Sequence, residues 1–133
     1  MKKLFGIVLI AVCFGLCAFT CDESDDGDVV TEFSPITSTT LPDEGKVNQS
    51  IEFVITHRGS NGCAQYSHNK TVTKGRDVFV TFFNSYKKDS FCTYALTTLE
   101  TSYSYKPSAV GEYTFHFKQE DGKYQEEKIT ISE

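Results

Sequence analysis

Short runs of β-branched and aromatic residues, broken by turn residues roughly every 10–15 positions, constrain this fold more than any other feature. From about residue 33 onward, no helical periodicity of useful length appears. Phe and Tyr are abundant, with 11 and 7 residues respectively, and both fit a half-buried, pleated surface. The pattern therefore predicts an all-β domain.

About seven strands are expected in residues 34–133, which predicts one two-sheet sandwich. In chain order they are Ser34–Leu41, Ser50–His57, a run from Cys63 that includes Tyr66, Asp77–Phe83, Phe91–Tyr105 (one bulged strand or two), Gly111–Lys118 and Lys123–Ser132. The polar segment Asn69–Arg76 is expected to hold a turn or a short strand, and Asn84–Ser90 a loop. Because Ile51, Phe53 and Ile55 alternate with more polar residues, they are expected to face the core.

The N-terminal segment has the composition of an export signal. A short basic start, Met1–Lys3, precedes an uncharged apolar run, Leu4–Phe19. That run is shorter than the roughly 20 residues that a transmembrane helix needs, and it fits the apolar region of a signal peptide. We therefore expect residues 1–20 to be a removable signal peptide.

Cys21 stands at the end of the apolar run, preceded by Ala18-Phe19-Thr20. This arrangement resembles a lipobox, in which small residues precede a cysteine that becomes acylated, although Phe19 is bulky and Thr20 replaces the usual Gly or Ala. The resemblance implies that Cys21 carries fatty acyl chains such as palmitate, which would anchor the protein to a membrane. The alternative is an ordinary secretory signal that leaves Cys21 as a free thiol.

An acidic run follows Cys21, and residues 21–33 are expected to form a flexible tether. Loss of the signal peptide would leave 11 basic and 18 acidic residues, a net charge of −7, and no basic stripe suited to nucleic acid is present. Asp22, Ser24 and Asp26 match the first half of a calcium-binding loop, but Phe33 occupies the position of its closing glutamate. A solvated spacer therefore explains the run better than a calcium site.

The acidic run resembles the export tether of surface lipoproteins in the Bacteroidota, which implies display on the outer face of the outer membrane. In enterobacteria, Asp22 directly after the cysteine would instead imply retention at the inner membrane. The segment Gly111-Glu112-Tyr113 resembles the tyrosine corner of immunoglobulin-like domains. That resemblance implies a backbone hydrogen bond from the Tyr113 hydroxyl and a core position for Tyr113, Phe115 and Phe117. Taken together, the chain resembles small immunoglobulin-like lipoproteins of the Bacteroidota, a group that implies a fold and a location but no activity.

Cys63 and Cys92 are the only cysteines in the predicted domain, and in an oxidising envelope a disulfide between them is expected. It would close a loop of about 30 residues and stabilise the fold by about 3.6 kcal/mol through loop entropy. The alternative is a zinc or thiol site, because His57, Cys63, His68 and Cys92 contain enough ligands for a tetrahedral ion. Their spacing matches no familiar ligand pattern.

The segment Asn84–Phe91 is a local anomaly, because it places two lysines beside two aromatic residues in an acidic protein. The candidate ligand loop consists of Tyr86, Lys87, Lys88 and Phe91. Such a loop is suited to a sugar or an anionic partner. The alternative is a plain hairpin loop in which Phe91 packs into the core.

No nucleophile elbow, zinc-protease motif or phosphate-binding glycine loop occurs in the sequence. We therefore expect a lipid-anchored, non-enzymatic binding or structural module without a metal or cofactor. Its partners would be the membrane, through the acyl chains, and an envelope protein or glycan. The alternatives are a thiol or metal protein and a small protease inhibitor.

Overall fold

The computed structural model describes residues 28–133 and contains nine strands with one 3₁₀ turn in that range. The elements are β1 (Val29–Ser34), β2 (Ile36–Thr40), β3 (Glu44–Lys46), β4 (Ile51–Gly59), β5 (Gln65–Lys74), β6 (Asp77–Lys87), β7 (Thr97–Tyr105), β8 (Gly111–Lys118), η1 (Glu120–Gly122) and β9 (Tyr124–Ser132). Residues 28–133 contain no helix that is long and apolar enough to cross a bilayer. The predicted signal peptide, the acylation site at Cys21 and most of the acidic tether lie outside the described residues.

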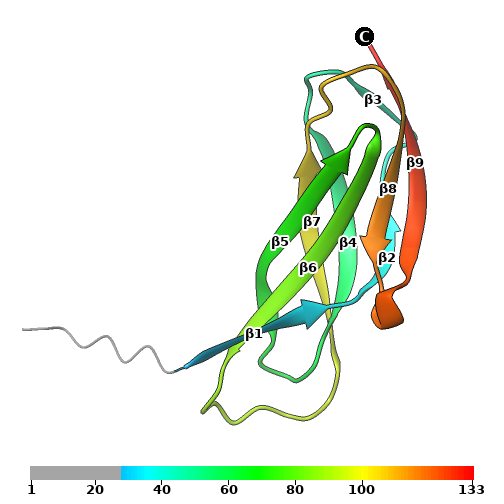
Figure 1. Cartoon of the computed structure of the whole chain (residues 1–133). Helices are drawn as coiled ribbons and strands as arrows, with labels where there is room; N and C mark the ends of the chain where they lie inside the picture. Colours follow the sequence, from blue (N-terminus) through cyan, green and yellow to red (C-terminus); the bar gives the residue numbers. More distant parts are fainter. Residues whose placement is uncertain (1–27) are drawn as a thin grey trace, which may run out of the picture.

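The strands form two sheets that pack face to face (Figure 1). The smaller sheet has the antiparallel order β2-β4-β7, and the larger has the order β1-β6-β8-β9-β3, with β5 also paired to β6. β6 organises the larger sheet, because β5 runs along one of its edges while β1 and β8 share the other. Ser34 of β1 pairs with Phe82, and Phe117 of β8 pairs with Val80. The predicted two-sheet sandwich is therefore confirmed.

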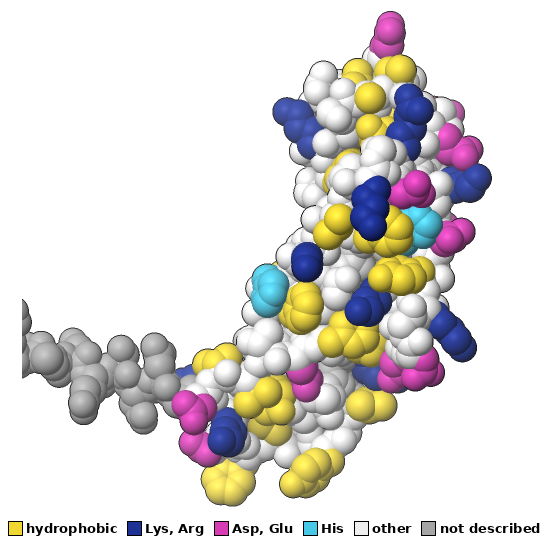
Figure 2. All heavy atoms as spheres, in the orientation of Figure 1, with side chains coloured by type: hydrophobic (Ala, Val, Ile, Leu, Met, Phe, Trp, Pro, Cys, Tyr) yellow, Lys and Arg dark blue, Asp and Glu magenta, His cyan; other side chains and the backbone are white. Residues whose placement is uncertain are grey.

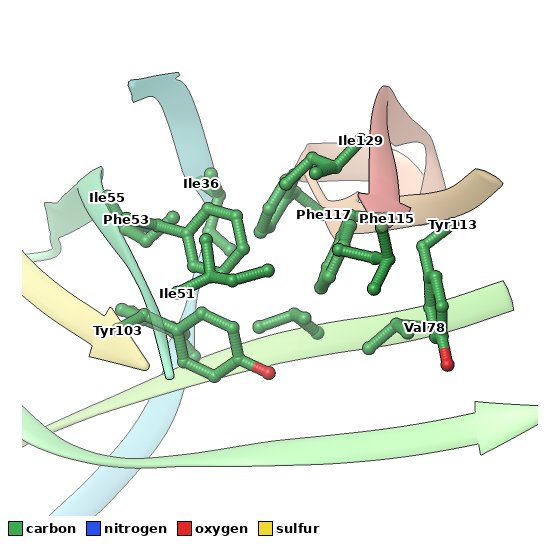
Figure 3. Packing of buried hydrophobic residues seen from close by; sticks show 13 residues of the cluster. Ile36, Ile51, Phe53, Ile55, Val78, Tyr103, Tyr113, Phe115, Phe117 and Ile129 are labelled. Atoms are coloured by element: carbon green, nitrogen blue, oxygen red, sulfur yellow. The ribbon is translucent and has the colours of Figure 1, made fainter. Parts of the chain in front are cut away.

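Alternating side chains of the two sheets form the core (Figure 3). Its buried members are Ile36, Ile51, Phe53, Ile55, Val78, Val80, Phe82, Tyr103, Tyr113, Phe115, Phe117, Ile129 and Ile131. Phe53 from the smaller sheet packs against Phe115 of the larger, with ring centroids 5.0 Å apart. The predicted inward positions on β4 and β8 are thus confirmed, and each large apolar side chain buried there stabilises the fold by about 1.5–3 kcal/mol.

A hydrogen bond from the Ala109 backbone N–H to the Tyr113 hydroxyl, 3.2 Å long, closes one end of the sandwich. The Tyr113 side chain is buried, while Gly111 begins β8 with φ = 129°, a conformation that favours glycine. The predicted tyrosine corner is therefore present. The strand directions differ from those of an immunoglobulin domain at two pairs: β6 runs parallel to β8, and β3 runs parallel to β9, whereas immunoglobulin sheets are antiparallel.

Two predicted boundaries are wrong for a common reason. β1 begins at Val29, inside the predicted tether, and β6 continues to Lys87, through much of the predicted loop Asn84–Ser90. These two segments pair with each other, with Val29 opposite Lys87 and Phe33 opposite Phe83. The first segment was assigned to the tether because it follows the acidic run, and the second is polar from Asn84 onward. The ladder of backbone hydrogen bonds between them orders both.

Two further boundaries also differ from the prediction. The polar segment expected to hold a turn or short strand is largely strand, because β5 reaches Lys74 and the turn falls at Gly75, where φ is +63°. In the stretch Phe91–Tyr105, which was expected to form one bulged strand or two, strand structure begins only at Thr97. The residues before Thr97 pair with no strand, and a disulfide at Cys92 holds them instead.

Candidate functional site

The predicted disulfide joins Cys63 and Cys92, with their Cα atoms 5.4 Å apart. It links the turn after β4 to the segment between β6 and β7. Next to it, the Gly62 backbone N–H donates a 2.8 Å hydrogen bond to the Thr93 carbonyl. We call residues 88–96 the stapled loop, because this cross-link fixes a segment that has no strand partner.

The disulfide contradicts the zinc or thiol alternative. Neither Cys63 nor Cys92 carries a thiolate, so two of the four proposed ligands are lost. His57 is buried, and both of its ring nitrogens are hydrogen-bonded within the protein. His68 stacks on Phe83 at a centroid distance of 4.7 Å. Within residues 28–133, no three metal-ligating side chains gather at one place.

A buried polar network connects the two sheets around His57. Its Nδ1 lies 2.7 Å from the Ser34 hydroxyl on β1, and its Nε2 lies 2.9 Å from the Thr101 hydroxyl on β7. The Ser34 hydroxyl donates to the Arg58 carbonyl at 2.8 Å, so His57 donates from Nδ1 and accepts from Thr101 at Nε2. Asn84 of β6 donates to the same Ser34 oxygen at 3.0 Å.

This network has the residue types of a hydrolase but is closed to substrate. Ser34, His57 and Asn84 are fully buried. The Ser34 oxygen accepts from both His57 and Asn84, which is the reverse of the role of a nucleophile that hands its proton to a base. Desolvation by burial lowers the pKa of His57 and keeps its ring neutral. The network therefore joins the two sheets, and its side chains are bonded to one another and are not exposed to solvent.

The candidate ligand loop is divided by the structure. Tyr86 is half-buried within β6, whereas Lys87 and Lys88 are exposed where the strand ends. The Phe91 side chain is fully exposed, so the alternative in which it packs into the core is wrong. Tyr94 and Leu96 are also exposed on the stapled loop, and sequence reasoning missed them because they lay in a predicted strand. Figure 2 shows hydrophobic side chains projecting at this end of the molecule.

A second candidate site lies on the outer face of the larger sheet. We call it the aromatic–lysine face, and it comprises Phe33, Phe79, Phe83, Tyr124, Lys70, Lys74 and Lys118. His116 stacks on Phe79 with ring centroids 4.4 Å apart, and Tyr124 meets Phe79 edge-on at 5.7 Å. The face looks toward the viewer in Figure 2, where hydrophobic, lysine and histidine side chains alternate.

Lysines lie among these rings. The Lys74 ammonium lies 5.5 Å from the Phe79 ring centroid, and the Lys118 ammonium lies 5.1 Å from that of Phe33. Lys70 lines the same shallow depression of about 380 Å³, together with Val72, Thr81 and Phe83. This arrangement presents ring surface and positive charge side by side in a chain whose net charge is −5.

A comparison with known protein families identifies the sandwich. The model of the ORF11 beta-sandwich domain matches residues 53–131. The chain belongs to the ORF11 beta-sandwich domain family. No curated protein and no solved structure gives a significant match.

The ORF11 beta-sandwich domain contains most of both candidate sites. The match runs from β4 to β9 and so includes the disulfide, the stapled loop and six of the seven members of the aromatic–lysine face. Phe33 on β1 precedes it. A cavity of about 320 Å³ lies where β1 meets the ORF11 domain, between Phe33 and Leu96, and the Arg58–Glu120 ion pair (3.1 Å) borders it. Arg58, the only cation in the lining, is paired with Glu120, and Glu32 and Asp121 also line the cavity. We assign no ligand to it.

Proposed function

We propose that this protein is a lipid-anchored cell-envelope protein of the Bacteroidota surface type, whose ORF11 domain binds a partner without catalysis. The aromatic–lysine face is the observation that carries the proposal. A solvent-facing sheet surface usually carries small polar and charged residues, whereas this one carries four aromatic rings with three lysines among them. We infer that its ligand is an extended acidic glycan.

The chemistry of the face supports that ligand. Aromatic rings offer flat apolar surface on which a sugar ring packs, and Tyr124 is well exposed at the margin of the depression. Lys70, Lys74 and Lys118 supply ammonium donors for the carboxylate or sulfate groups of an acidic sugar chain. On the other side of the rings, His116 Nε2 lies 2.9 Å from Asp77 Oδ1, and His116 Nδ1 lies 3.2 Å from Glu126 Oε1. One margin of the face is therefore acidic. This asymmetry favours a strand-like ligand that lies along β5 and β6.

Features of the sequence support the anchor. The expected signal peptide ends at Cys21, and the acidic run follows it directly. Only six residues lie between Cys21 and Asp28, the first described residue, and the sandwich begins at Val29. A short connection of this kind would hold the domain close to the membrane surface.

Binding is tested by calorimetric titration with polygalacturonic acid as the acidic probe and laminarin as a neutral one. The face variant is Lys70→Glu with Lys118→Glu, and the matched control is Lys106→Glu with Lys123→Glu, two exposed lysines outside the face. We expect the face variant to weaken polygalacturonate binding by about tenfold or more. The control should bind like the wild type, and laminarin should bind weakly to all three. If the face variant binds as the control does, the face is not the site.

Anchoring is tested separately in the native host by metabolic labelling with a fatty acid. We expect label on the wild-type protein and none on Cys21→Ala, which should move to the soluble fraction. Protease shaving of intact cells should then remove the wild-type domain. A wild-type protein without label would refute the anchor, and a labelled domain that resists shaving would place it on the periplasmic side.

A further inference from the structure

The stapled loop exposes large apolar side chains that take no part in the core of the sandwich. Relative to an extended reference, Phe91 is 106%, Tyr94 99% and Leu96 64% exposed to solvent. Two fully exposed rings and a leucine within six residues form an unusual concentration of apolar surface, whereas scattered exposed residues would need no explanation. The disulfide holds the loop in place, so the exposure belongs to an ordered segment.

This loop lies at the end of the domain where the chain enters from its N-terminal side (Figure 1). The Lys88 backbone N–H donates a 2.9 Å hydrogen bond to the Asp28 carbonyl, and Val29 pairs with Lys87. Val29 is itself 57% exposed. The first described residues and the base of the stapled loop are therefore direct neighbours.

The length of the connection limits how far this end can lie from an anchor at Cys21. Six residues lie between Cys21 and Asp28, and even a fully extended chain spans only about 25 Å over the seven steps from Cys21 to Asp28. The opposite end of β6 lies about 33 Å farther along the strand, given its 11 residues. An anchor at Cys21 would therefore hold the end with the stapled loop, and not the opposite end of the sandwich, next to the membrane.

We propose that the stapled loop is a membrane-docking element that inserts Phe91, Tyr94 and Leu96 into the interfacial layer of the bilayer. This inference rests on the proposed acylation of Cys21. Aromatic rings are favoured at the lipid–water interface, and the two adjacent lysines can pair with anionic headgroups. Because the disulfide already orders the loop, its insertion costs less conformational entropy than that of a free loop. The acyl chains hold the protein to the membrane, while the loop fixes its orientation.

The test uses the absence of tryptophan from the chain, which makes any introduced indole a unique reporter. One variant carries Phe91→Trp. The matched control carries Val110→Trp, which lies 41% exposed in the turn before β8, at the other end of the sandwich. The chain Cys21–Glu133 has one free thiol once the disulfide has formed. That thiol is coupled to a maleimide lipid in vesicles of phosphatidylcholine and phosphatidylglycerol that contain brominated acyl chains.

We expect the indole of Phe91→Trp to shift its emission to the blue and to lose roughly half or more of its intensity to bromine quenching. The indole of Val110→Trp should be unaffected. Equal quenching in the two variants, or none in either, would overturn the proposal. Tyr94→Trp serves as a second reporter should Phe91→Trp fail to fold by circular dichroism. Because the coupling is chemical, the result does not depend on whether the host acylates Cys21, so failure of the anchor and failure of the loop are distinguished.

Discussion

The buried histidine predicts how the stability of this protein depends on pH. His57 is completely enclosed between the sheets, and its two nitrogens are used by Ser34 and Thr101. Desolvation by burial lowers its pKa below the ordinary value of 6.5. In the unfolded chain the same ring is solvated and takes up a proton near pH 6.5. Folding is therefore linked to proton release from His57.

The sign and the limit of this effect follow from linkage. Above about pH 6.5 the ring is neutral in both states, and the full stability is present. Below it, the unfolded chain binds a proton that the folded protein does not, so the free energy of unfolding falls as the pH falls. The slope is at most about 1.4 kcal/mol per pH unit, and the loss from His57 between about pH 7.5 and 5.5 is at most about 1.4 kcal/mol. Protonating the folded ring would also break the hydrogen bond that Nε2 accepts from Thr101.

The assay is urea unfolding followed by circular dichroism at several pH values between about 7.5 and 5.5. The side chain of His57→Gln cannot titrate. Its free energy of unfolding should be lower by about 1–3 kcal/mol at every pH, because the hydroxyls of Ser34 and Thr101 are left imperfectly paired. The stability difference between wild type and His57→Gln should therefore shrink as the pH is lowered. The control His68→Gln removes an exposed histidine and should keep the wild-type slope. If His57→Gln shows the same slope as the wild type, the buried ring does not account for acid sensitivity.

Two further predictions concern the cross-link and the tyrosine corner. The double variant Cys63→Ser, Cys92→Ser opens a loop whose ends are 29 residues apart in sequence. We expect its free energy of unfolding, measured with urea, to be lower than that of the wild type by about 3.6 kcal/mol. A loss below about 1 kcal/mol would mean that the disulfide barely restrains the unfolded chain. Tyr113→Phe removes the hydroxyl that accepts the hydrogen bond from the Ala109 N–H but keeps the packing of the ring. Its free energy of unfolding should be lower by about 1 kcal/mol in the same assay. An unchanged midpoint would show that this hydrogen bond contributes nothing net.

The sandwich was predictable wherever a strand has one apolar face. Ile51, Phe53 and Ile55 alternate along β4, and Tyr113 and Phe115 along β8, and all five are buried. A period of two in the side-chain pattern specifies both the strand and its inward face from local sequence alone. These strands could therefore be predicted without knowing which strands they pair with.

The polar elements were not predictable in this way, because their order comes from pairing between distant segments. Ser34, His57 and Asn84 belong to three different strands, and their network forms only after β1 has paired with β6. Asn84 alone has the character of a turn residue, so its segment was predicted to be a loop. The aromatic–lysine face was missed for the opposite reason. Phe79 and Phe83 lie in a strand so apolar that its sequence does not show which of its side chains face outward.

The two proposed surfaces are compatible in one orientation. With the stapled loop against the bilayer, β6 rises from Lys87 near the lipid to Asp77 about 33 Å away. The aromatic–lysine face then looks along the plane of the membrane. Its depression around Phe79 lies in the half of β6 that is distant from the membrane. A glycan could reach it without displacing the anchor. It follows that loop variants should change the tilt of the domain on vesicles but not polygalacturonate binding, whereas face variants should do the reverse. If a loop variant also lost the glycan, the two surfaces would have to be one site.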